Sequence, residues 1–484
     1  MAPRHNFEIP KVFLLATLIV FCGCARRLDA TTIVAADWLP PSASVSVNWP
    51  VFGHDPSRSG SVADRHLTPG SLMRLRLRWR INLGDVADSS PIVVGSHVFL
   101  TSKNGTTYAL NVSDGHIAWR FATQGPNITT SVPAYDSSTK ALYVPGVDGF
   151  IHKLDVATGH ELPGPGFPAQ ITSAPETEKN ASSLNIANGY IYAQTSGYFG
   201  DATPYVGHVV AIRLSDGMKT VFNSLCSLQH KLIEPQSCSQ QRSGMWSRSG
   251  VVVDPDPSMG GRIYVATGNG PFNPSEGDYG DSVLSLSSDA GHLLSYYAPS
   301  NYADLETSDL DVGSSSPALL PREARSTTPL MAVQGGKDAV LRLLDRTRLG
   351  GVGHALQTID LSDKLFSAPA VWADHGTTWV IIDVSDGVHA YKVVTHNGKS
   401  RLAEAWHSNV ESTSEGTSPV VNNGIVFVAG NGALIALDAK DGHRLWTRSI
   451  GPVHWESPVM ANSTLYCSDQ DGNVVAYGLT SGAR

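Results

Sequence analysis

IALDAKDGHRLW, residues 435–446, is the stretch of sequence that decides the fold. It begins with apolar residues, passes through a polar pair to Asp-Gly, and ends on a tryptophan. Asp-Gly supplies the positive φ angles of a tight hairpin turn, and alternating residues place one set of side chains on each face of a sheet. The stretch therefore predicts two antiparallel strands joined by a tight turn.

The same phrase recurs through the chain in eight copies, including this one. A strand pair of one type, such as TSPVVNNGIVFVAGNG, precedes each copy. The period is therefore about four strands, the size of a propeller blade, and it predicts an all-β, eight-bladed β-propeller of four-stranded antiparallel blades. The other copies are YALNVSDGHIAW (108–119), HKLDVATGHEL (152–162), VAIRLSDGMKTV (210–221), LSLSSDAGHLLSYY (284–297), LRLLDRTRLGG (341–351), AYKVVTHNGKSRLAEAW (390–406) and VAYGLTSG (475–482).

The two ends of the repeat region are complementary. The last copy stops at LTSG (479–482), before its tryptophan-bearing strand, while an unmatched strand of that type, LRLRWRINL (75–83), opens the first repeat. We expect this N-terminal strand to complete the last blade, which removes both free sheet edges. Trp119, Trp406 and Trp446 are expected to be buried between neighbouring blades as structural anchors. Blades three and four are expected to carry most of the inserted loops.

Composition bounds the class of protein. The 484 residues are 41% hydrophobic and 16% charged, which is typical of a globular protein. The formal charge of -8 is evenly spread, so no footprint for nucleic acid is present. We predict a signal peptide at 1–24, a linker at 25–48 and the propeller at 49–484, with no transmembrane segment after processing. The export signal ends in FCGC, so either Cys24 is lipidated or cleavage occurs nearby, after Ala25 or Ala30.

Three cysteines lie beyond this region. Cys226 and Cys238 flank a short loop, and pairing them in an oxidising compartment would stabilise the protein by on the order of 3 kcal/mol, so we expect a disulfide. Cys467 alternates with apolar neighbours and is expected to be a core residue. No C-x-x-C-H phrase is present, so no c-type haem attachment is predicted.

The eight phrases resemble the pyrroloquinoline quinone (PQQ) repeat, over roughly residues 49–484. Two functional branches share that fold. One is the quinoprotein alcohol dehydrogenases, which hold PQQ and a calcium ion at the propeller axis. The other is non-catalytic envelope propellers such as the outer-membrane assembly lipoprotein BamB, which bind partner proteins.

The segment GMWSRSGVVVDPDPSMGGRIYVATGNGPFN resembles the dehydrogenase stretch with a tryptophan floor under the quinone and a calcium-binding asparagine. The resemblance assigns these roles to Trp246 and Asn269. It assigns the quinone-contacting lysine to Lys337, in VQGGKDAVLRLLDRTRLG, and the catalytic aspartate to Asp309 or Asp311. An indole offers a planar stacking surface, an amide oxygen suits calcium, and a cation beside the quinone carbonyl would stabilise developing negative charge.

Each of these residues also has a structural interpretation. Asn269 can be a turn residue that tolerates left-handed geometry between two glycines, and the acidic residues of 304–311 can form a solvated loop. The family's second calcium ligand, a glutamate, has only Asp201 as a substitute here, and the vicinal cysteine pair of many dehydrogenases is absent. We interpret His208, His292 and His443 as surface residues because they lack metal-ligand spacing.

Two functions follow from the resemblance. In the first, an exported quinoprotein of the periplasm or cell envelope oxidises a small-molecule alcohol, polyol or sugar with PQQ and calcium, and passes electrons to a separate acceptor. In the second, the propeller is a rigid scaffold for envelope proteins. A hydrolase or glycan-binding protein is a third possibility, since paired carboxylates at a propeller mouth could serve it.

Overall fold

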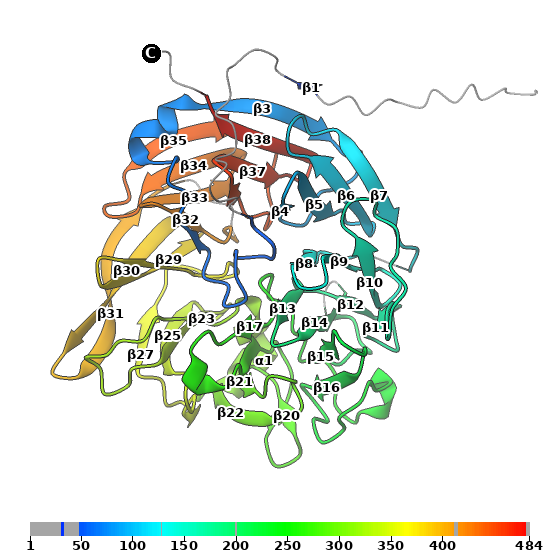
Figure 1. The fold of residues 1–484 in the computed structure, drawn as a ribbon. Coiled ribbons are helices and arrows are strands. Elements are labelled where there is room, and N and C mark those ends of the chain that lie inside the picture. Colours follow the sequence, from blue (N-terminus) through cyan, green and yellow to red (C-terminus); the bar gives the residue numbers. More distant parts are fainter. Residues whose placement is uncertain (1–30, 33–47, 127, 199–200, 411–414, 481–484) are drawn as a thin grey trace, which may run out of the picture.

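Eight antiparallel sheets stand in a ring in the computed structural model of the chain, which describes residues 31–32, 48–126, 128–198, 201–410 and 415–480 (Figure 1). The predicted eight-bladed β-propeller is therefore confirmed. The predicted signal peptide, with Cys24, and most of the predicted linker lie outside the described residues. No helix in the described ranges is long and apolar enough to cross a membrane.

The first four blades follow one another along the chain. Blade 1 contains β4 (Ile92–Val94), β5 (His97–Thr101), β6 (Thr106–Asn111) and β7 (Ile117–Ala122). Blade 2 contains β8 (Ala134–Asp136), β9 (Ala141–Pro145), β10 (Phe150–Asp155) and β11 (Ala169–Gln170). Blade 3 contains β13 (Asn185–Ala187), β14 (Tyr190–Gly197), β15 (His208–Arg213) and β16 (Lys219–Asn223), with β12 (Glu178–Asn180) also paired to β14. Blade 4 contains β17 (Val252–Val253), β18 (Ile263–Ala266), β21 (Val283–Leu286) and β22 (Leu293–Ala298), with β26 (Gly351–Val352) parallel to β22.

The last four blades complete the ring. Blade 5 contains β23 (Ala318–Leu319), β24 (Met331–Gln334), β25 (Val340–Asp345) and β27 (Gln357–Asp360). Blade 6 contains β28 (Ala370–Asp374), β29 (Thr377–Val384), β30 (Gly387–His396) and β31 (Lys399–Ser408). Blade 7 contains β32 (Val420–Asn422), β33 (Ile425–Gly430), β34 (Ala433–Asp438) and β35 (Arg444–Ser449), with β2 (Ser61–Val62) parallel to β32. Blade 8 contains β36 (Val459–Ala461), β37 (Thr464–Ser468), β38 (Asn473–Leu479) and β3 (Leu75–Asn82), and β1 (Thr31–Thr32) pairs with β3.

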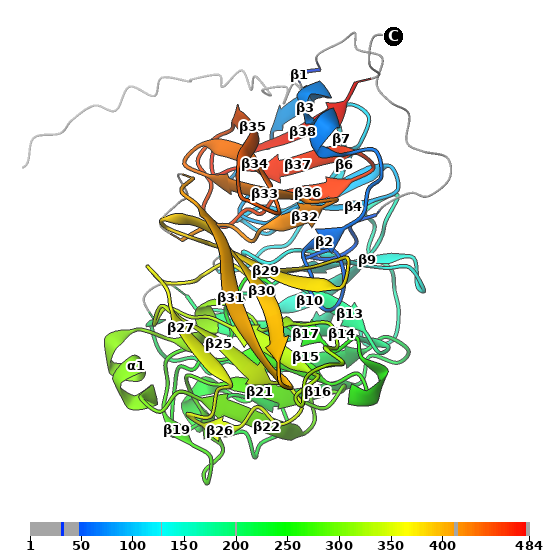
Figure 2. The ribbon, with the colours of Figure 1, turned by 90° about the vertical axis from the view of Figure 1, so that its left-hand side faces the viewer.

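The ring closes as predicted, with the N-terminal strand completing the last blade. Strand β3 pairs antiparallel with β38, with Arg80 opposite Val475, so the first strand of the repeat region lies beside the last. Figure 1 shows this as blue β3 next to red β38, and Figure 2 shows the same pair from the side. β3 thereby covers the outer edge of β38, and this pairing holds the two ends of the repeat region together.

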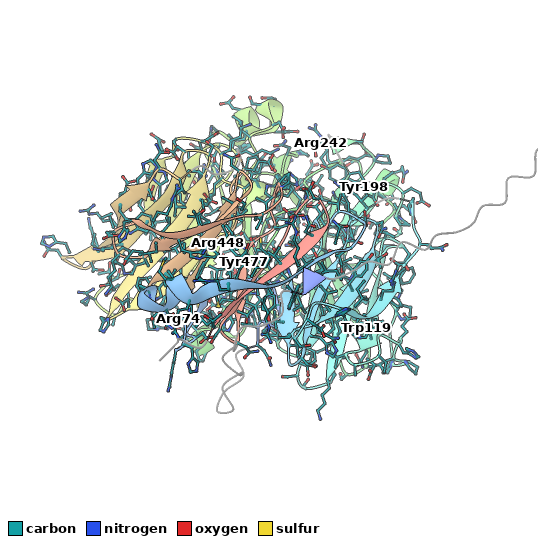
Figure 3. All side chains as sticks on the ribbon, turned by 90° about the horizontal axis from the view of Figure 1, so that it is seen from above. Arg74, Trp119, Tyr198, Arg242, Arg448 and Tyr477 are labelled. Atoms are coloured by element: carbon teal, nitrogen blue, oxygen red, sulfur yellow. A yellow bond between two sulfur atoms is a disulfide. The ribbon has the colours of Figure 1, made fainter. Side chains whose placement is uncertain are left out.

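Burial explains the pattern of apolar and polar residues in the strands. Every residue of β33 is buried, because a middle strand is covered on both faces by neighbouring blades. In the outer strand β35 only Trp446 is buried. Trp446 packs edge-on against Tyr477 of the next blade with Arg448 over its ring, and Figure 3 labels these two neighbours. The inner strands are therefore continuous apolar runs, whereas the outer strands mix buried apolar residues with exposed polar ones.

The repeated tryptophan docks on the turn glycine of the next blade. The indole Nε1 of Trp119 donates to Val156 O at 3.2 Å, and a Cβ added to Gly159, at φ +71°, would lie 2.4 Å from the ring. Glycine is therefore required at this position for two reasons: the indole ring leaves no room for a side chain, and the backbone has a positive φ. The predicted anchors Trp119, Trp406 and Trp446 are all buried. The same docking joins Trp79 to Gly115 and Trp406 to Gly442.

Blades 3 to 5 carry most of the elements outside the repeat. These elements are the 3-10 helices η3 (Pro235–Ser237), η4 (Pro257–Met259) and η5 (Val312–Ser314), the hairpin β19 (Phe272–Asn273) with β20 (Asp278–Tyr279), and α1 (Tyr302–Ser308). A further 3-10 helix, η1 (Pro69–Arg74), leads into β3. The structure joins Cys226 to Cys238 by a disulfide around η3, and Cys467 is a buried free thiol.

Candidate active site

A cavity of about 470 Å³ lies where all eight blades meet. Its walls come largely from the connections that lead into the first strand of each blade, with Lys103 and Lys337 added from connections between second and third strands. Segments so far apart in sequence converge only at the axis of a propeller (Figure 1). The cavity is therefore axial. The connections into blades 1 to 8 contribute, in that order, Asp88, Thr130, Ala181, Arg248, Asp311, Phe366, Glu415 and Trp455.

Three aromatic rings form one side of the cavity. The ring of Trp246 lies 6.0 Å from those of Phe366 and Trp455, and the latter two lie 6.1 Å apart at 24°. All three side chains are only half-buried, unlike the blade anchors. They therefore offer apolar surface to whatever enters the cavity.

Cations stand around these rings. The ammonium of Lys337 lies 5.1 Å from the centre of the Trp246 ring, and the guanidinium of Arg248 lies 4.3 Å from that of Trp455. Lys103, Lys179 and Lys364 also line the cavity. Planar apolar surface beside clustered cations favours binding of a planar anion.

The residues that the sequence singled out form a single chain of contacts. The indole Nε1 of Trp246 donates to Asp311 Oδ2 at 2.7 Å. Lys337 Nζ bridges Asp311 Oδ1 at 2.8 Å and Asp309 Oδ1 at 2.6 Å. Asn269 Nδ2 donates to the same Asp309 oxygen at 2.6 Å. Five residues from four separate segments, predicted separately, are thus brought together.

The two aspartates differ in environment. Asp311 is buried, and burial raises the pKa of its carboxyl group although Lys337 opposes the shift. Burial alone would lower the pKa of Lys337, but the charge of Asp311 and the hydrogen bond with Asp309 raise it. Asp309 caps α1 in left-handed geometry at φ 52° and keeps 67% of its side chain exposed. Asp309 can therefore meet a substrate, while Asp311 holds Trp246 and Lys337 in place.

The acidic segment does not form a solvated loop throughout. Residues 302–308 are the helix α1, and Asp311 is buried. Leu305 packs inward from this helix, Asp304 faces solvent, and Glu306 lies 3.6 Å from Arg242. The loop interpretation fits only Asp309 and Leu310, which lie between α1 and the buried Asp311.

Asn269 is not held by the geometry of a left-handed turn. It is absent from the residues with positive φ, as are Gly268 and Gly270. Gly268 is needed for close approach instead, since a Cβ there would lie 2.7 Å from Asp311 Oδ2. The side chain of Asn269 is buried, and in the described ranges no group donates a hydrogen bond to its Oδ1. This oxygen is available for a cation.

Asp201 lines the same cavity but has a different partner. Its Oδ1 accepts a hydrogen bond from the Tyr205 hydroxyl at 2.7 Å. Burial raises the pKa of Tyr205, and the charges of Asp201 and Asp311 raise it further, so the phenol remains protonated. Among the described side chains, no hydrogen bond or ion pair joins Asp201 to Asn269, Asp309, Asp311 or Lys337.

The sequence analysis did not identify a second group of charged residues that line the cavity. Arg248 Nη2 lies 3.2 Å from Asp88 Oδ1, and His454 Nε2 lies 3.0 Å from Glu415 Oε2. Burial opposes protonation of His454, but its hydrogen bonds with Asp88 and Glu415 raise its pKa to about 9. Burial lowers the pKa of Lys179 to about 8. The cavity therefore mixes these cations with carboxylates, since Asp88, Asp201, Asp309, Asp311 and Glu415 line it as well.

Two further polar residues also escaped prediction. Asp281 is fully buried, and its backbone N–H donates to Gly268 O at 3.0 Å. Burial raises the pKa of its carboxyl group to about 8, and the charge of Asp311 adds to this shift.

His208 was predicted to lie at the surface, which is wrong. It is buried in blade 3 because both ring nitrogens find backbone carbonyls, Val206 O at 3.0 Å and Ile171 O at 2.6 Å.

Comparison with known proteins finds two groups of relatives. A family model described as outer membrane protein assembly factor BamB matches residues 75–224 and 377–484, just over half of the chain. The chain is 24% identical over 289 residues to polyvinylalcohol dehydrogenase from Pseudomonas sp, a match that covers 53% of this chain and 44% of the relative. It is 29% identical over 119 residues to outer membrane protein assembly factor BamB from Escherichia coli (strain K12), covering 24% of this chain and 28% of the relative.

The chain spans less than half the length of the curated polyvinylalcohol dehydrogenases that it matches. Among solved structures, the quinohemoprotein alcohol dehydrogenase ADHIIG from Pseudomonas putida HK5 superposes with a TM-score of 0.66 at 14% identity, covering 90% of this chain and 81% of that one. A likeness at this identity concerns the fold alone.

Proposed function

The chain belongs to the PQQ-repeat family whose model is described as outer membrane protein assembly factor BamB, and we propose that this member is a quinoprotein-like oxidoreductase that oxidises an alcohol, polyol or sugar. One observation carries the proposal. The axial cavity combines a partly exposed aromatic side, a rim of cations and an unsatisfied buried amide oxygen in one place.

The cavity fits PQQ, which is planar and carries three carboxylates. Trp246 would support the ring system, as stacking on an indole requires. Lys337 and Lys179 would neutralise the carboxylates and the quinone oxygens, while Arg248 is held by Asp88. When bound, PQQ supplies a two-electron acceptor for the oxidation of a hydroxyl-bearing carbon.

The oxygen atoms beside Trp246 fit a hard cation such as calcium. Asn269 Oδ1 is buried and unsatisfied, and the Asp309 carboxylate is in direct contact with the same side chain. Amide and carboxylate oxygens are the ligands that calcium takes in proteins. We propose Asn269 and Asp309 as ligands, with Asp201 as a third after release of Tyr205.

Asp309 is the proposed general base. It is the exposed member of the pair and reaches the cavity, so it can accept the proton of a substrate hydroxyl. Asp311 is proposed as a positioning residue, because its two oxygens are occupied by Trp246 and Lys337. Lys337 remains a cation at neutral pH, since its pKa is raised, and it would stabilise negative charge near the reacting centre.

An activity measurement tests this function. The purified protein, given PQQ and calcium, should reduce an artificial electron acceptor when supplied with alcohols, polyols or sugars. Asp309→Asn should lower kcat strongly, since a general base contributes about 10²–10⁴-fold. His443→Ala, at an exposed turn of blade 7, is the matched control and should behave as wild type.

The second candidate function is a scaffold for envelope proteins, which the family description and the BamB relative favour. Under that function the protein neither binds PQQ nor reduces the acceptor with any substrate. For both functions we propose export to the periplasm or cell envelope, from the signal predicted at 1–24. Lipidation of Cys24 would anchor the protein to a membrane, and mass spectrometry of the mature N-terminus would detect it.

A further inference from the structure

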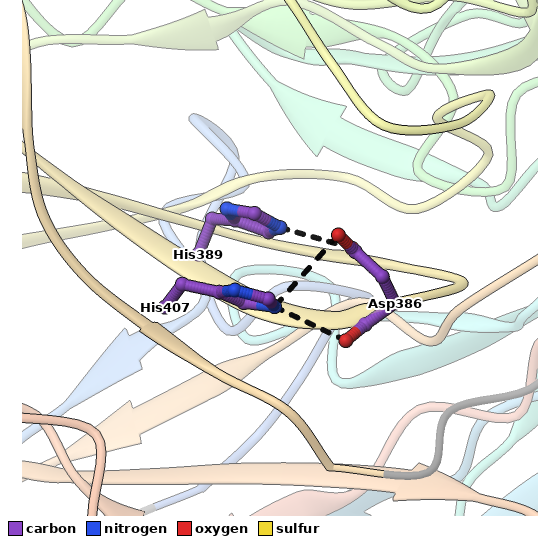
Figure 4. A group of neighbouring side chains, drawn as sticks. All are labelled: Asp386, His389 and His407. Atoms are coloured by element: carbon purple, nitrogen blue, oxygen red, sulfur yellow. Dashed lines mark hydrogen bonds and ion pairs between the residues drawn. The ribbon is translucent and has the colours of Figure 1, made fainter.

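A second cluster of chemically active side chains lies on blade 6, away from the axial cavity. Asp386 is in the turn between β29 and β30, His389 is on β30, and Glu404 and His407 are on β31. None of the four lines the axial cavity. Figure 4 shows Asp386 with both imidazole rings turned toward it, and the long β30–β31 hairpin stands out in Figure 2.

The register of the hairpin explains why these residues meet. His389 and His407 are directly opposite each other across the two strands, so their side chains share a face. A β-bulge between Ala390 and Tyr391 shifts the register by one residue. The shift brings Glu404 onto the face that carries the two histidines, because a bulge re-aims the side chains that follow it.

The contacts within the cluster are short and directional. His389 Nε2 lies 3.0 Å from Asp386 Oδ1, and His389 Nδ1 lies 3.0 Å from Glu404 Oε1. His407 Nε2 lies 3.1 Å from Asp386 O and 3.8 Å from Asp386 Oδ2. The two imidazoles stack with centroids 4.1 Å apart and planes at 7°. Both Nε2 atoms therefore converge on one carboxylate.

Blade 2 contains the same arrangement with one histidine fewer. His152 Nε2 lies 3.0 Å from Asp148 Oδ2 and Nδ1 lies 2.6 Å from Glu161 Oε1. Asp148 again occupies the turn before the third strand of its blade. A histidine held between two carboxylates is therefore a feature of the repeat that fastens a hairpin. That feature does not account for His407, whose ring is stacked on His389.

The stacked pair leaves three metal-binding groups facing one point. The Nε2 atoms of His389 and His407 lie on the same side of the stack, toward the Asp386 carboxylate. A cation shared by both Nε2 atoms and the carboxylate would use all three groups. We propose that Asp386, His389 and His407 bind a divalent late transition-metal ion, with Glu404 positioning His389.

The donor set selects the class of metal. Two imidazole nitrogens and one carboxylate suit Zn²⁺, Cu²⁺, Ni²⁺ or Co²⁺, whereas Ca²⁺ and Mg²⁺ take oxygen ligands. The ligand atoms already lie within 4.8 Å of one another. Zinc bonds of about 2.0–2.2 Å require them to close to about 3.5 Å, which rotation of the half-exposed His407 and Asp386 side chains permits.

The arrangement around His389 is the one that metal-binding histidines adopt. Its Nδ1 is directed at the Glu404 carboxylate, which fixes the tautomer and leaves Nε2 for the metal. Three protein ligands leave a fourth position of a tetrahedral ion open to water or another ligand. A metal-binding imidazole nitrogen must be unprotonated, so metal binding releases any proton held there.

Zinc uptake by the untagged protein tests the proposal. Equilibrium competition with a chromophoric zinc chelator, in excess calcium to occupy any hard-cation site, should give one more zinc equivalent for wild type than for His407→Ala. Zinc should also raise the unfolding temperature of wild type and leave that of His407→Ala unchanged. Cobalt should give a visible tetrahedral spectrum that is lost in the same variant.

The control variant is His152→Ala, which removes the equivalent histidine of blade 2. It should take up as much zinc as wild type. Because His407 is partly exposed, His407→Ala should fold, and an unchanged far-UV circular dichroism spectrum in chelator checks this. The proposal is overturned if wild type binds no zinc, or if wild type and His407→Ala bind the same number of equivalents with equal affinity.

Discussion

Replacing Lys337 by methionine should destabilise the protein through the buried Asp311. Lys337 is 15% exposed, Asp311 is 2% exposed, and their charged atoms lie 2.8 Å apart. Removing one partner of a buried ion pair costs about 3–5 kcal/mol, because the other charge is left without compensation. The contact with Asp309 adds little, since that side chain is 67% exposed. We therefore expect a loss of about 3 kcal/mol at pH 7.

The double variant separates this effect from simple loss of packing. Asp311→Asn keeps an oxygen that accepts the Trp246 N–H and removes the charge, so it should cost about 1 kcal/mol alone. In Lys337→Met/Asp311→Asn no buried charge remains, so the double variant should cost about 1 kcal/mol. The coupling energy should therefore be about 3 kcal/mol in magnitude. Urea unfolding followed by tryptophan fluorescence measures it, and effects that add within about 0.5 kcal/mol would refute the reasoning.

The same variant has a predicted pH dependence. Without Lys337, burial holds the folded-state pKa of Asp311 further above its unfolded value, so the folded protein binds more protons. Stability must then fall as the pH rises from the unfolded pKa of about 3.9 through the folded one. The cost of Lys337→Met should be smaller at pH 5 than at pH 8.

Three further predictions follow from the fold and the cavity. Gly159→Ala should lower the free energy of unfolding in urea by about 3 kcal/mol, whereas Gly189→Ala, with a similar φ but nothing within 4 Å of the added Cβ, should lower it by about 1 kcal/mol. Equal losses would exclude a clash with the docked tryptophan. Affinity for PQQ should fall as the pH rises through about 8 to 9, because Lys179 and His454 lose their charges there. His454→Gln should show a weaker pH dependence by fluorescence titration. Reducing the Cys226–Cys238 disulfide should lower the unfolding free energy by about 3 kcal/mol, and an unchanged denaturation midpoint in reductant would argue against this.

The fold could be predicted from the sequence because its rule is local and repeated. Asp-Gly turns and period-two strands recur, and the unmatched strand at 75–83 points to closure with the last blade. The docking of Trp119 on Gly159 also follows from a pattern that can be read in the sequence. Each copy supports the others, so a weak local signal becomes decisive.

Half of the residues that line the cavity were not predicted, because they lie outside the repeated phrase with its Asp-Gly turn. Asp88, Thr130, Phe366 and Trp455 each stand three positions before the proline of a Ser-x-Pro or Ser-Pro phrase that opens a blade. In four blades this position faces the axis, so the register of the repeat contained the signal. Contacts such as that of Arg248 with Asp88 depend on how the blades close in space, which no local pattern gives.

A titration with PQQ tests the central claim most directly. Fluorescence quenching of the mature protein by PQQ in the presence of calcium would be compared with that of Asn269→Ala and Trp246→Ala. We predict saturable binding to wild type that requires calcium, weakened strongly in both variants, while His443→Ala binds as wild type does. Binding that is absent from wild type, or equally strong in all four proteins, would contradict a cofactor site at the propeller axis.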